Sequence, residues 1–322
     1  MTDSSASAPN FFLVGAPKAG TTALYDALHT HTDIFVSPIK EPNYFCTDLN
    51  SQSIPPQLHD RLPLDIESYL NSDPRPVLQT AWIVNEDFYS RLFEGAQSFV
   101  AIGECSTTYL YSRVAARRIR EFNPSAKIIA ILRDPVDRAW SHFLMDRRIG
   151  IANEGFRQTV MQEFEGNARW ENSRLYLALG KYGEQLSRYY DNFPSEQILV
   201  LRYDRLREYP SEIFMRICAF LGVAPSDEMI TRQNVAQEAR FRRINRWLHT
   251  SGIKKRLRVL FPSVIKRQLR KAWFRHQIEP HPDEEFRQEM RKWFSDDLAI
   301  ASRLTGLDLS DWSRNSQAAR KS

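Results

Sequence analysis

The sequence has few of the features that mark membrane-spanning, disulfide-stapled or metal-binding proteins. Its longest apolar runs, at residues 11–16 and 128–132, are far shorter than the roughly 20 residues that cross a bilayer. No basic-then-apolar signal peptide opens the chain. The three cysteines, Cys46, Cys105 and Cys218, have no metal-ligand spacing and are typical of reduced thiols. We therefore expect a cytoplasmic protein without a bound metal, whose cysteines are small core or pocket-wall residues.

Glycine and proline are also scarce, at 12 and 17 of 322 residues, while 42% of residues are hydrophobic. This composition is globular and excludes a disordered or fibrous chain. The net charge of +5 is unevenly distributed: residues 240–275 contain 13 Lys or Arg and no Asp or Glu, whereas the other 286 residues carry 31 basic and 39 acidic side chains. An acidic body with one cationic segment indicates a local anionic partner and argues against a nucleic-acid-coating protein.

Short apolar runs alternate with helical patterns over much of the chain. Strands are predicted at 11–14, 34–37, 99–103, 127–132 and 198–202, and helices at 21–29, 113–122 and 210–221. A further helix is expected to begin at Pro135 with Asp134 as its cap. Alternation of this kind predicts parallel βαβ units, whose ligands bind beyond the carboxyl ends of the strands. We predict an α/β fold with a P-loop-like central parallel sheet, helices on both faces and a helical C-terminal extension.

The chain divides into four parts by composition. Residues 1–9 form a polar leader and residues 314–322 a polar tail. Between them we predict a main domain over 10–239, with an inserted flap at 47–86, and a basic helical extension over 240–313 that is packed on the domain or attached to it.

The segment from Gly15 to Thr22 follows a predicted buried strand and opens a helix. In this context backbone N–H groups and the helix dipole hold an anion. In a nucleoside-triphosphate loop the lysine follows the last glycine, whereas here Thr21 follows Gly20 and the lysine is Lys18. The spacing therefore favours an anion cradle and disfavours a kinase or ATPase. An ordinary strand-to-helix turn is the alternative.

A second candidate anion site lies further along the chain. Arg133 ends a predicted strand, and Ser141 lies within the first two turns of the following helix. The planar fork of arginine and a hydroxyl together suit a separate phosphate. The alternative is that Arg133 pairs with Asp134 or Asp137 and that Ser141 is a helix-surface residue.

Four segments in order resemble one family, and they cover about residues 10–225. Pro17-Lys18-Ala19-Gly20-Thr21-Thr22 is similar to the 5′-phosphosulfate loop of the sulfotransferases that use 3′-phosphoadenosine 5′-phosphosulfate (PAPS). Residues 128–150, with Leu132-Arg133-Asp134-Pro135 and Arg138-Ala139-Trp140-Ser141, resemble their 3′-phosphate site. Lys40-Glu41-Pro42-Asn43-Tyr44-Phe45 and Glu104-Cys105-Ser106 to Tyr109 resemble two boxes of the carbohydrate-type and bacterial branch, which includes heparan sulfate sulfotransferase-like domains.

The resemblance implies PAPS as sulfuryl donor, adenosine 3′,5′-bisphosphate as product and no metal. It makes Lys18 the cation that stabilises the departing phosphate oxygen and Glu41 the general base. The implied donor-binding residues are Pro17, Lys18, Ala19, Gly20, Thr21, Thr22, Arg133 and Ser141, joined at the 3′-phosphate by Arg240, Arg242 or Arg243. The implied substrate-binding residues are Lys40, Glu104 and Tyr182.

Alternatives stay open for several of these residues. Glu41 and Lys40 could be a solvated surface pair, and Tyr182 could be a core residue. Glu104 could hold Lys18, line the acceptor pocket or cap a helix. Relatives that sulfate phenols use a histidine base, for which His29, His31 and His142 are the candidates, although structural roles explain all three. Cys105 stands where heparan-type relatives often carry a lysine, which weakens the case for a highly anionic glycan acceptor.

The basic segment at residues 247–275 interleaves apolar residues with its cations, and Pro262 divides it into two predicted helices. The pattern is typical of interfacial membrane helices, so the segment could seat the protein on anionic lipid at the inner face of the membrane. Alternatively its apolar face packs on the core, while the arginines before it reach the 3′-phosphate.

The sequence thus predicts a sulfotransferase that moves a sulfuryl group to a hydroxyl of a carbohydrate, glycolipid or other small metabolite. The alternatives are a nucleotide-dependent phosphotransferase or kinase, and a non-enzymatic protein that binds anionic lipid or nucleic acid. We expect no nucleic-acid partner.

Overall fold

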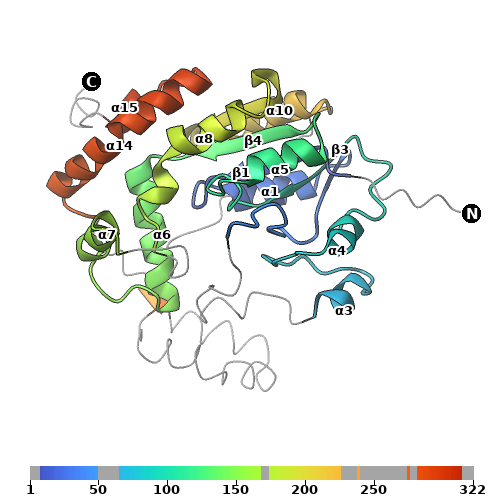
Figure 1. Cartoon of the computed structure of the whole chain (residues 1–322), viewed down its shortest axis with the longest axis horizontal. Coiled ribbons are helices and arrows are strands. Elements are labelled where there is room, and N and C mark those ends of the chain that lie inside the picture. The colour runs from blue at the N-terminus through green and yellow to red at the C-terminus, as the bar shows by residue number, and fades with distance from the viewer. Residues whose placement is uncertain are drawn as a thin grey trace, which may run out of the picture.

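A central sheet of five parallel strands organises the computed structural model, which describes residues 8–49, 65–167, 174–225, 238–239, 274–275 and 281–313. The strands lie in the order β2-β3-β1-β4-β5 (Figure 1). Their bounds are β1 Phe11–Gly15, β2 Ile34–Val36, β3 Ala101–Cys105, β4 Lys127–Leu132 and β5 Ile198–Arg202. Every residue of β1 and β3 is buried, because helices cover both faces of the sheet. A separate antiparallel pair joins β6 (Glu238–Ala239) to β7 (Phe274–Arg275).

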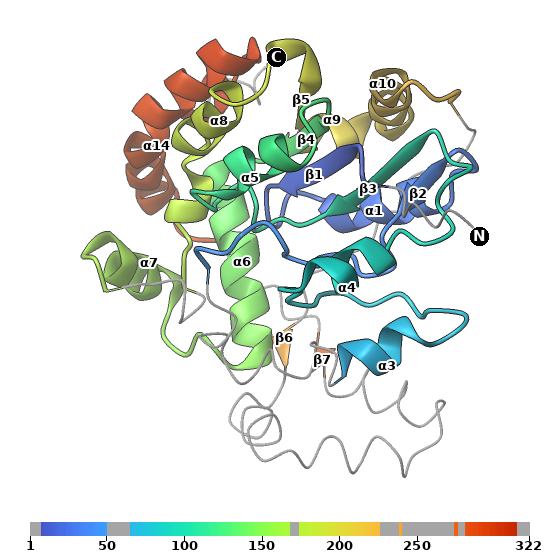
Figure 2. The ribbon, with the colours of Figure 1, turned by 45° about the vertical axis from the view of Figure 1, so that its right-hand side comes forward.

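Helices pack on both faces of the sheet. Their bounds are α1 Thr21–His29, α3 Ile66–Leu70, α4 Glu86–Arg91, α5 Ala115–Phe122, α6 Pro135–Ile149, α7 Phe156–Phe164, α8 Tyr182–Tyr190, α9 Tyr203–Glu208, α10 Pro210–Leu221, α14 Glu284–Thr305 and α15 Ser310–Ser313, with short 3₁₀ turns at Ala178–Gly180 and Ser195–Gln197. The end of α1 lies beside α10, because the ring of His31 is 6.0 Å from that of Phe214. Helices α5 and α8 pack together on the opposite face. In Figures 1 and 2, α6 and the segment that carries α3 and α4 both extend below the sheet.

The predicted α/β fold is confirmed. Helix α1 and strands β4 and β5 have the predicted bounds, and Gly222 ends α10 in a left-handed conformation as expected. Strand β3 begins two residues later than predicted and continues to Cys105, because Val100 is exposed at the sheet edge and the buried run starts at Ala101. All three cysteines are buried, and none forms a disulfide bond.

The segment predicted as a flap supports the domain. Between the short helices α3 and α4, Leu78 forms a parallel bridge with Ile39. The backbone N–H of Lys40 donates to the carbonyl of Leu78 (2.9 Å), and that of Leu78 donates to the carbonyl of Pro38 (2.9 Å). The described part of the segment therefore lies alongside the Lys40-Glu41-Pro42 loop as an extra extended strand.

The C-terminal region is described at residues 281–313. Here α14 packs on α8 and α6 through the buried side chains of Phe286, Met290, Phe294 and Leu298. Nearly all of the basic segment lies outside the described residues, as do Arg240, Arg242 and Arg243, the tail and residues 1–7 of the leader. None of the helices in the described ranges is both long and apolar enough to cross a membrane.

Candidate active site

The order of the strands gathers three loops at one edge of the sheet. Strand β1 lies between β3 and β4 and is parallel to both, with Leu13 opposite Cys105 on one side and Ile129 on the other. The carboxyl ends of the three strands therefore meet, and the chain leaves β1 for one side of the sheet and β3 for the other. Ligands of open α/β sheets bind at such a switch point.

The loop after β1 is held close to the sheet and leads directly into α1. The N–H of Ala16 donates to the carbonyl of Ile131 on β4 (2.8 Å). Gly20 caps α1 with a φ of 90°, and a Cβ at this position would lie 2.8 Å from the ring of Tyr203, so glycine is required on both counts. No side chain caps α1, which leaves the N–H groups at Thr21 and Thr22 for an external anion.

Arg133 joins the loop after β4 to the loop after β1. Its Nη1 donates to the carbonyl oxygen of Lys18 at 3.0 Å. The guanidinium also lies over the ring of Tyr203, 4.9 Å from the ring centroid. The two candidate anion sites are therefore neighbours on the same side of the molecule.

The alternative partners of Arg133 are engaged elsewhere. Asp134 caps α6 by accepting the N–H groups of the first turn, and its other oxygen lies 3.8 Å from Arg291 of α14. Asp137 forms a 2.9 Å ion pair with Arg287, also of α14. The alternative in which Arg133 pairs with one of these aspartates is therefore wrong.

Lys18 contacts α6, the helix that carries Ser141. Lys18 has a φ of 69°, and its Nζ lies 3.6 Å from Sδ of Met145. Ser141 is half-buried one turn before Met145, so the two lie on the same face of α6. Lys18 thus contacts both Arg133 and the face of α6 on which Ser141 lies.

Glu41 lies on a loop that backbone hydrogen bonds fix on one side. The carbonyl of Glu41 accepts the N–H of Ala81, and the carbonyl of Pro42 accepts the N–H of Ile83, each at 2.9 Å. The extended segment after α3 therefore sets the path of this loop.

The Glu41 carboxylate is half-enclosed. Its Oε1 accepts hydrogen bonds from Nζ of Lys40 (2.9 Å) and Oγ1 of Thr107 (3.2 Å), while Oε2 has no hydrogen bond within the described part of the chain. The side chain is 20% exposed, and that of Lys40 is only 4% exposed. A solvated surface pair is therefore excluded, and because Thr107 follows β3, Glu41 lies at the same sheet edge as Lys18.

The predicted role of Glu104 in substrate binding needs correction. Its side chain is fully buried, and its carboxylate accepts hydrogen bonds from the hydroxyls of Tyr89 and Tyr109 (2.8 Å each) and of Ser106 (2.9 Å). It neither bonds Lys18 nor caps a helix, and burial removes it from an acceptor pocket. Burial also raises the pKa of Glu104 to about 7, against the opposing effect of these hydrogen bonds.

Comparison with known proteins identifies the family. The sulfotransferase domain family matches residues 8–299 of the chain. The chain belongs to this family. The resemblance predicted from the four motifs is thus confirmed, as is membership of the transferases, and PAPS is the sulfuryl donor of the family.

Two curated relatives and one solved structure illustrate the range of the family. The chain is 27% identical to rat carbohydrate sulfotransferase 15 over 252 residues, which cover 68% of this chain and 45% of the relative. It is 31% identical to human bifunctional heparan sulfate N-deacetylase/N-sulfotransferase 2 over 226 residues, covering 67% and 22%. The chain thus spans less than half the length of these relatives. The crystal structure of a sulfotransferase from Alicyclobacillus acidocaldarius aligns with a TM-score of 0.66 and 28% identity, covering 96% of this chain and all of that one.

The predicted role of Tyr182 also needs correction. Its side chain is fully buried, and its hydroxyl donates to the carbonyl of Arg133 at 2.8 Å. Burial raises its pKa. Tyr182 therefore fixes the end of β4 from within the core and does not form a wall of the acceptor pocket. This is the alternative that the sequence left open, in which Tyr182 is a core residue.

The histidines have structural surroundings. His142 is buried on α6, where burial and the charges of Arg138 and Lys18 lower its pKa well below the ordinary value. His31 is buried and its Nε2 lies 2.9 Å from the carbonyl of Ala224, while His29 lies in the last turn of α1.

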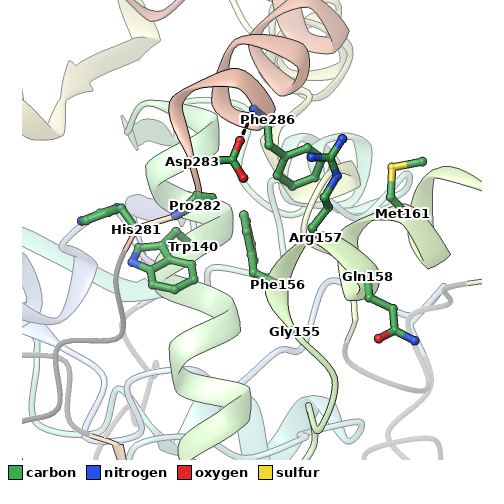
Figure 3. A pocket seen from close by; sticks show the side chains of 10 residues that line it. All are labelled: Trp140, Gly155, Phe156, Arg157, Gln158, Met161, His281, Pro282, Asp283 and Phe286. Atoms are coloured by element: carbon green, nitrogen blue, oxygen red, sulfur yellow. Dashed lines mark hydrogen bonds between the residues drawn. The ribbon is translucent and has the colours of Figure 1, made fainter.

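A cavity of about 760 Å³ lies elsewhere, between α6, α7 and the start of α14 (Figure 3). It is lined by Trp140, Gly155, Phe156, Arg157, Gln158, Met161, His281, Pro282, Asp283 and Phe286. Met145, which contacts Lys18, follows Trp140 by five residues, or about 140° around the helix, so the two side chains leave α6 on different faces. This cavity is therefore separate from the site at the sheet edge. The described residues contain no cluster of His, Cys, Asp or Glu that could hold a metal.

Asn43 holds the loop that carries Glu41, a contact that the motif did not reveal. It is buried with a φ of 56°, and its Nδ2 donates to the carbonyls of Glu41 (2.9 Å) and Ala81 (2.8 Å). Asparagine adopts positive φ more readily than most other residues with a side chain. An asparagine just after Lys40-Glu41-Pro42 was therefore the signal in the sequence for a tight turn at this point.

Tyr182→Phe tests the core role of Tyr182. We expect it to lower the free energy of unfolding by about 1 kcal/mol, because the carbonyl of Arg133 loses a buried donor, and to leave the acceptor KM unchanged. Urea denaturation and steady-state kinetics would measure the two effects. The exposed Tyr209→Phe is the matched control. A raised acceptor KM at an unchanged free energy of unfolding would show that Tyr182 lines the acceptor pocket after all.

Proposed function

We propose that the protein transfers the sulfuryl group of PAPS to a hydroxyl of a carbohydrate, glycolipid or other small metabolite. The hydrogen bond between Arg133 and the carbonyl of Lys18 carries the proposal, because it brings two anion sites to one place. PAPS has a phosphosulfate at its 5′ end and a phosphate at its 3′ position, so one donor molecule would occupy both sites.

The two sites suit different ends of the donor. The N–H groups and hydroxyls of Thr21 and Thr22, at the uncapped start of α1, would hold the 5′-phosphate. Arg133, which has no acidic partner among the described residues, and Ser141 would hold the 3′-phosphate. The central position of β1 in the sheet then directs the sulfuryl group toward the Glu41 side.

The chemistry requires a base and a cation at opposite ends of the transfer. The bond between sulfur and the 5′-phosphate oxygen breaks, a bond from sulfur to the acceptor oxygen forms, and the acceptor proton passes to Glu41. Oε2 is the accepting atom, because Oε1 is held by Lys40 and Thr107. Lys18 and the N–H groups of α1 stabilise the charge that grows on the departing oxygen.

The acceptor class rests on the relatives and on one position in this chain. Two similar proteins are a carbohydrate sulfotransferase and a heparan sulfate N-deacetylase/N-sulfotransferase, which supports a carbohydrate acceptor. Cys105 is buried where heparan-type relatives often carry lysine, so we favour an acceptor with less negative charge. Lys40 is 4% exposed and is bonded to Oε1 of Glu41 (2.9 Å), so it would act on the acceptor only through Glu41.

Several predictions from the sequence remain predictions. The contact of Arg240, Arg242 or Arg243 with the 3′-phosphate and the membrane contact of residues 247–275 concern residues outside the described ranges. A cytoplasmic location, at the inner face of the membrane or free of it, also stays a prediction. Calorimetric binding of adenosine 3′,5′-bisphosphate without magnesium, and no binding of ATP with magnesium, would separate sulfuryl from phosphoryl transfer.

Lys18→Ala tests the stabilisation of the leaving group. We expect a loss of about 100-fold or more in kcat, because charge on the departing oxygen is no longer balanced. Transfer of radiolabelled sulfuryl from PAPS would measure it, with circular dichroism to confirm the fold. Lys292→Ala, which removes an exposed lysine on α14, should keep full activity. A Lys18→Ala protein with near-normal kcat would refute the assigned role.

Glu41→Gln tests the base. We expect transfer to be abolished while adenosine 3′,5′-bisphosphate still binds, because the amide cannot take the acceptor proton but leaves the donor site unchanged. The same transfer assay and calorimetry measure the two quantities. Glu67→Gln, on the exposed face of α3, is the matched control. Retention of most of the activity in Glu41→Gln would show that another group is the base.

A further inference from the structure

We infer that Glu104 is a positioning residue for Glu41: its ionised carboxylate fixes the direction of two hydroxyl hydrogen bonds that hold the loop carrying the base. The inference rests on the proposed function, because it names the group that aligns the catalytic carboxylate. Glu104 itself touches neither donor nor acceptor, since its side chain is fully buried.

Two backbone N–H groups hold the loop after Glu41. The N–H of Asn43 donates to Oγ of Ser106, and the N–H of Phe45 donates to the hydroxyl oxygen of Tyr109, each at 3.2 Å. Both hydroxyls therefore act as acceptors toward the loop.

The direction of these bonds depends on Glu104. A hydroxyl has one hydrogen and two lone pairs, so Ser106 and Tyr109 must direct their own hydrogens elsewhere. Ser106 donates to Oε2 of Glu104 (2.9 Å), and Tyr109 donates to Oε1 (2.8 Å), where Tyr89 also donates (2.8 Å). Glu104 thus accepts three hydrogen bonds and donates none, a pattern that only a carboxylate can satisfy.

Complete burial makes the direction strict. Glu104, Ser106, Tyr109 and Tyr89 are all inaccessible to solvent, so water cannot replace a lost partner. An amide at position 104 would donate to one of the hydroxyls, and that hydroxyl would lose the Glu104 oxygen that accepts its own hydrogen. An unsatisfied buried polar group of this kind is costly, and the loop would shift to relieve it.

The same turn reaches the catalytic carboxylate by a second path. Oγ1 of Thr107 donates to Oε1 of Glu41 (3.2 Å), and Oγ1 of Thr108 donates to Oδ1 of Asn43 (2.6 Å). Asn43 in turn donates to the carbonyl of Glu41 (2.9 Å). The residues after β3 therefore hold both the backbone and the side chain of Glu41, with Glu104 at the base of the network.

The surroundings of Glu104 oppose the ionised state of its carboxyl group. Burial raises the pKa of Glu104 to about 7, so its surroundings disfavour the ionised form that the hydroxyls require. A carboxylate kept in such surroundings is more typical of a functional role than of packing.

Glu104→Gln tests the inference with two separate measurements. We expect the amides of Asn43 and Phe45 to exchange hydrogen at least 10-fold faster, and kcat to fall at least 10-fold, while the Kd for adenosine 3′,5′-bisphosphate changes less than twofold. Asp297→Asn is the control for a carboxylate-to-amide change away from the site, since Asp297 accepts the backbone N–H groups of Gly183 and Glu184 at the start of α8. It should leave both the loop exchange and kcat unchanged.

Ser106→Ala keeps the inference testable if Glu104→Gln does not fold. It should also speed hydrogen exchange at Asn43 and lower kcat, with the Kd for adenosine 3′,5′-bisphosphate unchanged. The loss of kcat in the double variant should be smaller than the two single losses combined, because the amide at position 104 no longer faces the hydroxyl hydrogen of Ser106. Normal loop exchange or normal kcat in both folded single variants would overturn the inference. If the wild type transfers no sulfuryl group, the proposed function fails, and the exchange rates alone still decide whether Glu104 holds the loop.

Discussion

The hydrogen bond from Arg133 to the carbonyl of Lys18 joins the two loops on which the site depends. It is possible only because β4 lies directly beside β1, so that the residue after one strand can reach the loop after the other. On the other side of β1, β3 brings Thr107 to Glu41. The sheet order therefore places the loop after β1 between Arg133 on one side and Glu41 on the other. Under the proposed function, the donor would lie across the loops after β1 and β4, and the acceptor would lie on the Glu41 side.

Buried polar groups behind the site maintain its geometry. Tyr182 holds the carbonyl of Arg133, Asp134 caps the helix that carries Ser141, and Glu104 orders the hydroxyls below the Glu41 loop. Tyr182 and Asp134 bond backbone groups and Glu104 bonds hydroxyls, so these hydrogen bonds do not involve the side chains of Lys18, Arg133 or Glu41. This separation explains how a motif can contain catalytic and positioning residues at neighbouring places in the sequence.

The local features were predictable, and the distant contacts were not. The bounds of α1, β4 and β5 follow from apolar runs and from glycine, which are local signals. The partners of Asp134 and Asp137 lie on α14, about 150 residues away, so no local pattern could show that Arg133 is left for a ligand. Glu104 and Tyr182 were placed at the acceptor because they occur near family motifs, whereas only packing shows that both are in the core. Leu78, which forms a bridge with Ile39, belongs to a segment with little periodicity. That segment was predicted to be a flap because it showed no strand pattern.

The central claim is that Lys18 and Arg133 hold one donor by its two ends. Calorimetry with adenosine 3′,5′-bisphosphate and adenosine 5′-monophosphate, on the wild type and on Arg133→Ala, tests it most directly. The account predicts that the wild type prefers the bisphosphate, that Arg133→Ala weakens bisphosphate binding by about 1.5–3 kcal/mol, and that this variant binds the two ligands almost equally. If Arg133→Ala still discriminates between them as strongly as the wild type, the 3′-phosphate does not bind at Arg133 and the account is contradicted.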